Sequence, residues 1–577
     1  MSPAVQPRFE IRLVPWRARL VLVAFIACFA VLAGRALYLQ GMHNDFLRQE
    51  GESRYSRVID ITATRGMIAD RNGEPLAIST PVESVAASPA DLDATPEQIA
   101  RLSALLAMDL GELRKKLGDP KREFVYLRRQ LPPEEAKKVI ELGIAGVFLQ
   151  REYRRYYPAA DVAAHIIGFT DVDDKGQEAL ELAFNDHLAG KAGSRRVIKD
   201  RLGRNVEDVE SIRRPQQGRD LTLAVDAKIQ YLASRELNKT VAEHRAKAAG
   251  IVVIDVATGE VLAMANYPSY NPNNRGKFDA RRTRNRAVTD LFEPGSTLKP
   301  FTAAAVLEAG AMRPESLIQT APGQMTIGNR VIRDAHPQGA LTVAQVIQKS
   351  SNIGAAKMAL AVPSETLWNV FSAVGFGTAP RSGFPGEAAG RLRAYASWRP
   401  IEQATMSYGH GISVSLLQLA RAYMVFATDG ELRPVTLLPH DGPAEGTRVI
   451  SPETARAVRR MLEMAVQPGG TAPRAQVTGY RVAGKTGTAH KIEGGGYAVD
   501  KYISSFVGIA PVSAPRLIVA VMIDEPSAGH YYGGTVAAPL FSRVMAGALR
   551  VTGVAPDVPL DNVVLPPADV PVIKEEV

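Results

Sequence analysis

One long apolar stretch near the N-terminus limits what this chain can fold into more than any other feature. Residues 20–39 are apolar apart from Arg35, and about 20 residues at ~1.5 Å each span the ~30 Å hydrocarbon layer of a bilayer. Four arginines and one glutamate precede the stretch, so the positive-inside rule puts the N-terminus in the cytoplasm. We expect a cytoplasmic segment over 1–19, a transmembrane anchor over 20–40 and everything later outside.

Two other interpretations of this stretch are a cleaved signal peptide and a lipoprotein. Residues 31–33 loosely resemble a signal-peptidase site, and Cys28, the only cysteine, could carry a lipid. The apolar stretch continues past Ala33 to Leu39, which is longer than a typical signal core. An uncleaved anchor is therefore favoured.

Length and composition bound the rest of the chain. With 577 residues it is too long for one hydrophobic core, and its 46% hydrophobic and 22% charged residues are ordinary for a globular protein. The net charge of +9 suggests attraction to a polyanion or a membrane surface. The sequence has no zinc-finger spacing, no long basic run and no histidines at metal-ligand spacing. We therefore expect no nucleic-acid partner, no metal and no cofactor.

The segment 41–218 carries no visible chemistry. It is mixed and charged, and its Asn72-Gly73 pair favours a tight turn. Periodicity predicts amphipathic helices over 97–117 and 133–142. No phosphate loop or pair of carboxylates stands out. We interpret this segment as a spacer or docking domain, here called the pedestal.

From residue 219 to 555 the pattern is that of a separate domain. Strand-like runs at both ends enclose a middle, 285–475, dominated by helical periodicity. The expected strands are 251–255, 261–265, 482–488, 505–509 and 517–523, the first two joined as a hairpin. This pattern predicts one sheet assembled from both ends of the domain, with a helical subdomain inserted. Five prolines from Pro556 onward predict a flexible tail over 556–577.

The first motif with chemical meaning is the run from Glu293 to Lys299. Pro294-Gly295 predicts a turn and 301–309 a helix, so Ser296 falls at or near a helix N-terminus, where unpaired amides favour developing negative charge. Lys299 lies one turn later on the same face, and as a neutral amine it can act as the base that activates the serine. Alone the motif is weak, because Ser-x-x-Lys is frequent by chance and serine is a common helix cap.

The second motif, Ser350-Ser351-Asn352, follows an apolar helix. Ser350 can relay a proton, and Asn352 can hold a substrate amide.

The third motif, Lys485-Thr486-Gly487-Thr488, lies in a strand-like run. Two lysines near one site repel each other, which favours the neutral amine on one of them. Gly487 predicts a close approach of a ligand backbone to a sheet edge, and the two threonine hydroxyls can bind a carboxylate.

In this order the three motifs resemble those of penicillin-binding proteins and serine β-lactamases. The resemblance implies that Ser296 attacks a D-alanyl-D-alanine peptide, with its own amide and that of Thr488 as oxyanion hole. It also implies a mixed α+β and α/β, multidomain protein whose second domain has a central antiparallel sheet flanked by helices. The predicted catalytic residues are Ser296, Lys299, Ser350, Asn352 and Lys485, and the predicted substrate-binding residues are Thr486, Gly487, Thr488, Glu293 and Tyr408.

Pedestal segments extend the resemblance. Residues 65–73 and 155–158 resemble the first two signatures of the class B pedestal. The third signature usually reads Gly-x-x-Gly-hydrophobic-Glu, and here Ala179 stands at its second glycine, before Leu180-Glu181. That substitution leaves the backbone geometry at this point open. Over residues 16–555 the chain is similar to the division-specific class B penicillin-binding proteins of the FtsI type.

This resemblance implies a serine-type D,D-transpeptidase of the bacterial inner membrane, single-pass, with its catalytic domain in the periplasm. Its substrates would be peptidoglycan stem peptides at the septum, its inhibitors β-lactams, and its partners a SEDS-family glycosyltransferase and other divisome membrane proteins. Residues 154–157 combine arginine and tyrosine, as docking surfaces often do. An elongation-type transpeptidase and a β-lactam sensor or scaffold without turnover stay open as alternatives.

Two enzyme classes that share parts of this pattern are disfavoured. A hydrolytic β-lactamase has no use for an anchor and a pedestal, and no Glu-Asp-x-x-Phe-like site precedes the serine domain, as a bifunctional class A enzyme would need. His490, Lys491, Tyr502, Tyr531 and Tyr532 follow the third motif. They could line the pocket mouth, or they could be packing and strand-end residues.

Overall fold

The computed structural model describes residues 15–39, 56–199, 205–275 and 279–565. The chain divides into two compact units, each made of several segments. The first contains 1–63, 82–152 and 191–216, and the second contains 64–81, 153–190 and 217–577. Two stretches of the predicted pedestal therefore pack within the second unit, because packing follows strand pairing and not sequence order. The boundaries 41–218 and 219–555 stay a prediction.

In the first unit, the N-terminal helix α1 (Pro15–Leu37) is long and apolar enough to cross a membrane. None of its residues is buried against other parts of the protein. It covers most of the predicted anchor and begins five residues before it. Most of the predicted cytoplasmic segment lies outside the described residues.

The rest of the first unit combines a small sheet with short helices. Its strands β1 (Ser56–Ile61), β6 (Gly193–Lys199) and β7 (Asn205–Arg213) pair antiparallel in the order β1-β6-β7. Between β1 and β6 in the chain, this unit also contains η2 (Pro89–Asp91), β4 (Val125–Leu131) and the helices α3 (Pro96–Leu105), α4 (Leu110–Leu117) and α5 (Pro133–Ile140).

One helix prediction in this unit is wrong. The single helix expected over 97–117 is two, α3 and α4. Ala107 between them has a φ of 48°, which ends the first helix. Asp109 then caps the second by accepting hydrogen bonds from the amides of Gly111 and Glu112.

The second unit is built on a five-stranded sheet. Its strands are β9 (Ala248–Asp255), β10 (Val261–Tyr267), β17 (Ala483–Glu493), β18 (Gly496–Ala510) and β19 (Leu517–Asp524). All neighbours pair antiparallel, in the order β10-β9-β19-β18-β17. The first two come from the start of the domain and the last three from its end, so the predicted sheet is confirmed. β17, which carries the third motif, lies at its edge.

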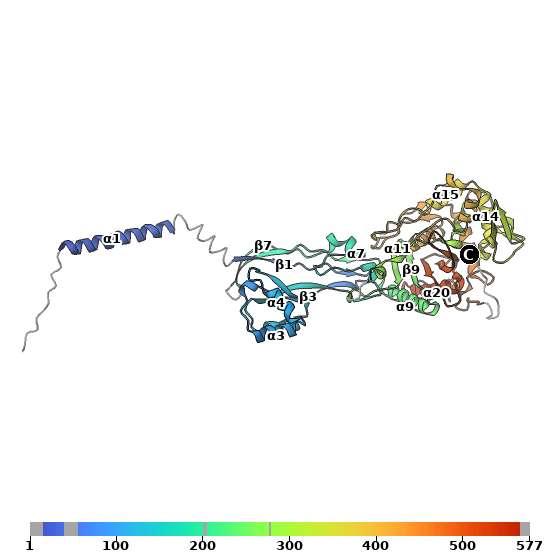
Figure 1. The fold of residues 1–577 in the computed structure, drawn as a ribbon. Helices are drawn as coiled ribbons and strands as arrows, with labels where there is room; N and C mark the ends of the chain where they lie inside the picture. Colours follow the sequence, from blue (N-terminus) through green and yellow to red (C-terminus); the bar gives the residue numbers. More distant parts are fainter. Residues whose placement is uncertain (1–14, 40–55, 200–204, 276–278, 566–577) are drawn as a thin grey trace, which may run out of the picture. The chain divides into compact units, whose positions relative to one another are not determined.

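Alternation along the strands sends apolar side chains to both faces of this sheet. In β9, Ile251 and Val253 belong to one hydrophobic cluster, and Val252 and Ile254 to another. The helices α9 (Ala227–His244) and α20 (Gly533–Val551) lie side by side and cover the first face (Figure 1).

The inserted region is mainly helical, as expected, with three two-stranded sheets. Its helices are α10 (Ala280–Thr283), α11 (Arg286–Thr289), η3 (Gly295–Leu298), α12 (Lys299–Glu308), α13 (Val343–Lys349), α14 (Asn352–Leu360), α15 (Ser364–Ala373), η4 (Tyr395–Ser397), α16 (Pro400–Met406), α17 (Leu416–Ala422), α18 (Met424–Ala427), α19 (Pro452–Val466) and η5 (Pro473–Ala475). Its strand pairs are β11 (Leu317–Gln319) with β14 (Ala340–Thr342), β12 (Gln324–Ile327) with β13 (Arg330–Arg333), and β15 (Glu431–Leu432) with β16 (Thr447–Arg448).

Pedestal segments within the second unit meet at a buried ion cluster. Glu181 accepts from Arg65 Nε at one carboxylate oxygen and from Arg155 Nε at the other, both at 2.7 Å. Ala179, at the position of the second glycine of the signature, has a φ of 50°. The chain therefore keeps the left-handed conformation that glycine favours, at a cost of about 1–2 kcal/mol for a residue with a Cβ. The short elements here are β2 (Ile68–Ala69), α6 (Ala164–Ile167), α7 (Ala179–Ala183), α8 (Asn185–Leu188) and β8 (Leu221–Thr222).

The strands β3 (Pro75–Ala87) and β5 (Val147–Tyr156) have residues in both units. At the end of β5, side chains alternate: Arg154 and Tyr156 are exposed, whereas Arg155 and Tyr157 are buried. Only two residues of the expected docking cluster are therefore available to a partner.

The C-terminal segment differs from its prediction. Residues 556–565 are held by hydrogen bonds to the second unit, through Asp557, Asn562 and Val564. This stretch is not a flexible tail, and residues 566–577 of the predicted tail lie outside the described residues.

Candidate active site

Ser296, the predicted nucleophile, lies just ahead of a helix, in a turn of residues 293–298 that is here called the nucleophile turn. η3 leads directly into α12, and Lys299 is the first residue of that helix. The helix thus begins two residues before the predicted 301. Gly295 has a φ of 56°, and a Cβ there would stand 3.1 Å from the carbonyl oxygen of Thr488. The turn therefore packs closely on the third motif, and Ser296 is 5% exposed.

Lys299 is fully buried and contacts both the first and the second motif. Its Nζ lies 2.9 Å from Ser296 Oγ, 2.5 Å from the carbonyl oxygen of Ser350 and 3.1 Å from Ser350 Oγ. This distance to Ser296 Oγ allows direct proton transfer from the hydroxyl to a neutral amine.

Ser350 occupies an unusual backbone conformation between two helices. It ends α13 with a φ of 62° and a ψ of 37°, a left-handed conformation that is rare for serine. This turn lets the Ser350 side chain reach both lysines, since Lys485 Nζ is 2.9 Å from the same Oγ. The hydroxyl therefore bridges two side chains 135 and 51 positions away in the sequence.

The second motif is held in place by a residue that the sequence did not indicate. Asp334 accepts a hydrogen bond from Ser351 Oγ at 2.5 Å and one from the amide of Ile353 at 3.0 Å. Asn352 is nearly buried and donates to the carbonyl oxygen of Arg333 at 3.3 Å. No local signal marks Asp334, because it lies just after β13 and meets the motif only in the folded chain.

The third motif lies on β17 with every residue buried. Lys485 Nζ is 3.2 Å from Thr486 Oγ1, and that hydroxyl is 2.9 Å from the hydroxyl of Thr471. Thr488 Oγ1 accepts from the amide of Gly533 at 3.1 Å. The two threonine hydroxyls predicted to bind a carboxylate are thus fixed by neighbours at the start of α20 and before η5.

The sequence predicts that Gly487 allows a ligand backbone to approach the sheet edge. In the structure, the atoms that approach Gly487 belong to other residues of this protein. A Cβ at this position would stand 2.4 Å from Ser505 Oγ, 2.7 Å from the carbonyl oxygen of Pro294 and 2.9 Å from Thr297 Cγ2. Two of these three atoms belong to the nucleophile turn. Glycine is required here so that the turn can approach β17.

Glu293, three residues before Ser296, accepts hydrogen bonds from two other parts of the domain. Its carboxylate accepts from the amide of Gly411 at 2.7 Å and from the hydroxyl of Tyr497 at 2.9 Å. Burial raises its pKa, and these two hydrogen bonds oppose the shift. Both oxygens are engaged inside the protein, which gives Glu293 a positioning contact beside its predicted role in substrate binding.

Aromatic rings continue from the third motif along the sheet edge. The ring of His490 lies 4.7 Å from that of Tyr502, which stacks on Tyr531 at 3.9 Å and 10°, and Tyr532 follows at 4.4 Å. These four rings therefore contact one another in a row, in which the Tyr502–Tyr531 pair is stacked and the other two pairs are tilted. Lys491 is engaged elsewhere, with its Nζ 2.8 Å from both carboxylate oxygens of Asp524.

A second aromatic group adjoins the nucleophile turn. Tyr408 is buried and meets the ring of His410 edge-on at 5.2 Å, and His410 lies 5.9 Å from the ring of Tyr497. Burial lowers the pKa of His410 to about 4. His410 is therefore neutral at pH 7, as expected of a packing residue.

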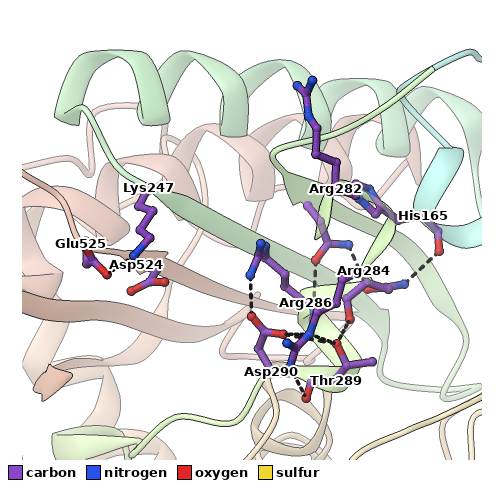
Figure 2. A network of polar contacts seen from close by, with 12 residues as sticks. His165, Lys247, Arg282, Arg284, Arg286, Thr289, Asp290, Asp524 and Glu525 are labelled. Atoms are coloured by element: carbon purple, nitrogen blue, oxygen red, sulfur yellow. Dashed lines mark hydrogen bonds and ion pairs between the residues drawn. The ribbon is translucent and has the colours of Figure 1, made fainter. Parts of the chain in front are cut away.

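The segment that leads to Ser296 is fixed by polar contacts (Figure 2). Arg286 donates to Asp290 at 2.8 Å. Asn285 donates to the carbonyl oxygen of His165 at 3.1 Å. His165 is itself bonded to the carbonyl oxygen of Arg282 at 2.9 Å, and burial lowers its pKa to about 4. His165 is therefore a buried structural residue.

Within the described residues, no group of three or more His, Cys, Asp or Glu side chains could hold a metal ion. The site instead consists of a serine, two lysines and a bridging hydroxyl, an arrangement suited to acyl transfer through a covalent ester.

Two family models match the chain. Residues 249–546 match the penicillin-binding protein transpeptidase domain, and residues 60–223 match the penicillin-binding protein dimerisation domain. The first match covers nearly the whole five-stranded sheet with its inserted helices, and the second covers most of the predicted pedestal.

Curated relatives match nearly the whole chain. A probable peptidoglycan D,D-transpeptidase, PenA, of Neisseria gonorrhoeae is 44% identical over 548 residues, 94% of each chain. The peptidoglycan D,D-transpeptidase FtsI of Escherichia coli is 41% identical over 550 residues, 94% of this chain and 93% of that one.

Solved structures of penicillin-binding proteins are also similar to this chain. The transpeptidase domain of penicillin-binding protein 3 from Burkholderia pseudomallei is 50% identical, with a TM-score of 0.54, and covers 58% of this chain and 98% of its own. Penicillin-binding protein 3 from Mycobacterium tuberculosis, in complex with aztreonam, is 28% identical, with a TM-score of 0.68, over 87% of this chain and 99% of its own. The chain belongs to the class B penicillin-binding proteins and is a peptidoglycan D,D-transpeptidase of the FtsI and PenA type.

Proposed function

We propose that Ser296 is the nucleophile with which this transpeptidase cross-links stem peptides at the division septum, and that β-lactams acylate the same residue. The observation that supports this most is the 2.9 Å contact between Ser296 Oγ and Lys299 Nζ in a buried cluster with Ser350 and Lys485. Two ammonium groups that share the Ser350 hydroxyl repel each other, which favours the neutral amine on one of them.

The proposed reaction uses these residues in two acyl-transfer steps. Ser296 Oγ attacks the carbonyl carbon of the penultimate D-alanine and gives its proton to the neutral amine of Lys299. The peptide bond then breaks, and the departing D-alanine amine takes a proton through the Ser350 hydroxyl. An ester on Ser296 remains, and the amino group of a second stem peptide attacks it to form the cross-link and release the serine.

The carbonyl oxygen gains negative charge in each attack. The amides of Ser296 and Thr488 would stabilise it, because the nucleophile turn packs against β17 at the backbone of Thr488. One such donor is worth about 3–4 kcal/mol in other acyl-transfer enzymes. Lys485, Thr486 and Thr488 would hold the substrate's terminal carboxylate.

Covalent labelling tests the nucleophile. In full-length protein in detergent, Ser296→Ala should abolish labelling by a fluorescent penicillin and leave the thermal melt nearly unchanged. Ser397→Ala, which alters an exposed serine of the same domain, should label normally. Mass spectrometry should find the adduct on the peptide that contains Ser296, and an adduct on another serine would refute the assignment.

We further propose that α1 anchors the chain in the inner membrane with the transpeptidase domain in the periplasm, where the pedestal contacts a SEDS-family glycosyltransferase and other divisome proteins. The exposed Arg154 and Tyr156 are candidates for such a contact. A fluorescent fusion should gather at midcell in dividing cells, whereas a dispersed lateral pattern would favour the elongation role. Arg154→Glu with Tyr156→Ala should keep penicillin labelling and block division.

A further inference from the structure

We propose that residues 554–565 form a C-terminal clamp that positions β17, and with it Lys485, for the acyl-transfer reaction. Asp557 and Asn562 are the positioning residues of this clamp. The proposal rests on the proposed role of Lys485 in the active site, and it adds residues that lie outside that site.

Asp557 joins the ends of two neighbouring strands. Its Oδ1 accepts from the amide of Arg481 at 2.8 Å, two residues before β17 begins. Its Oδ2 accepts from the hydroxyl of Ser513 at 2.6 Å, three residues after β18 ends. One carboxylate therefore fixes where the chain enters β17 relative to where it leaves β18.

Asn562 fixes the turn that precedes this point. Its Oδ1 accepts from the amide of Gly479 at 2.8 Å, and its Nδ2 donates to the carbonyl oxygens of Val477 at 3.1 Å and Tyr480 at 3.2 Å. The carboxamide of an asparagine can accept and donate in this way from one planar group.

Backbone and packing contacts close the clamp on both sides. The Tyr480 hydroxyl donates to the carbonyl oxygen of Val554 at 2.6 Å, and Gln476 exchanges two hydrogen bonds with the backbone of Val564, at 2.8 and 2.9 Å. A Cβ on Gly479 would stand 2.9 Å from Leu560 Cδ2. The segment thus covers the whole turn from residue 476 to 481.

The position of β17 at the sheet edge explains why it needs this support. Among the described residues it pairs with β18 on one side only, so no described strand restrains its other side. Lys485 lies four residues beyond Arg481, and a strand transmits a displacement over that distance because its backbone is extended and hydrogen-bonded. The 2.9 Å contact between Lys485 Nζ and Ser350 Oγ therefore depends on where the clamp holds the strand.

The test compares variants of the full chain in detergent micelles. The double variant Asp557→Ala with Asn562→Ala should acylate with fluorescent penicillin about tenfold to a hundredfold more slowly, as expected for a misplacement of up to 1 Å. Hydrogen exchange of the peptide 482–493, measured by mass spectrometry, should become faster. The single variant Asp557→Asn, which keeps the shape of the side chain and one accepting oxygen, should keep most of the acylation rate of the unmodified protein.

Two controls use the same segment. Asp561→Ala removes an exposed aspartate with no hydrogen-bond partner among the described residues, and a chain ending at Leu565 keeps the whole clamp. Both should behave as the unmodified protein. If the double variant fails to fold, Asn562→Ala alone is measured in the same way.

Unchanged exchange of 482–493, or a lower melting temperature with an unchanged acylation rate per folded molecule, would overturn the clamp. If the unmodified protein is not acylated at all, the proposed function fails, while the exchange measurement still decides whether the clamp holds β17.

Discussion

Replacing Gly487 by alanine should slow acylation of Ser296 without unfolding the protein. The backbone at Gly487 is extended, so alanine fits the local conformation and the only cost is steric. An added Cβ would meet the carbonyl oxygen of Pro294 at 2.7 Å, whereas ordinary contact begins at 3.4 Å. The nucleophile turn must therefore retreat from β17 by about 0.7 Å. The Ser505 hydroxyl, at 2.4 Å, can rotate away.

A shift of this size acts on the chemistry, because Ser296 and the third motif must both contact one substrate. Misplacement by 1 Å costs about a hundredfold in rate, so Gly487→Ala should lower the second-order rate constant for penicillin acylation about tenfold to a hundredfold. Stopped-flow or gel-based labelling of the full chain measures this. Gly496→Ala, at a hairpin glycine with nothing within 4 Å, is the matched control. A Gly487→Ala rate within twofold of the control would refute the reasoning.

Three further predictions address the base and the buried charges. Lys299→Arg should lose several orders of magnitude in acylation, since arginine stays protonated and cannot accept the serine proton; near-normal rates would reduce Lys299 to a positive charge. Glu181→Gln should lower the free energy of unfolding by about 3–5 kcal/mol in chemical denaturation, because it leaves two buried guanidinium groups uncompensated, and a loss below about 1 kcal/mol would contradict this. Burial raises the pKa of Asp174 from 3.8 to about 6, so the folded state binds its proton more tightly and stability falls as pH rises between these values. Asp174→Asn should therefore stabilise the protein at pH 7.5 and lose that advantage toward pH 4, and equal pH profiles would refute it.

Residues with a positive φ show which backbone conformations the local sequence can predict. The Asn72-Gly73 turn is present, with Gly73 at a φ of 86°, because turn preference depends on the residues of the turn alone. The backbone conformation of Ala179 could not be predicted from the sequence, because alanine adopts a left-handed conformation only where the surrounding structure imposes it. The helix expected over 97–117 failed for a similar reason: periodicity does not register one residue with a positive φ.

The sequence by itself determined which groups are candidates for the chemistry and in what order they come. Ser296, Lys299, Ser350 and Lys485 were identifiable as candidates because short motifs carry chemistry in residue type and spacing. The strands of the sheet were identifiable because short apolar runs are a local pattern. Only the tertiary structure decided that Ser350 Oγ bridges both lysines, that Asp334 holds the second motif and that Gly487 makes room for the nucleophile turn. It also decided that residues 554–565 fold back onto the turn before β17. These contacts join residues far apart in the chain, and their geometry depends on how the sheet and helices pack, which no local pattern encodes.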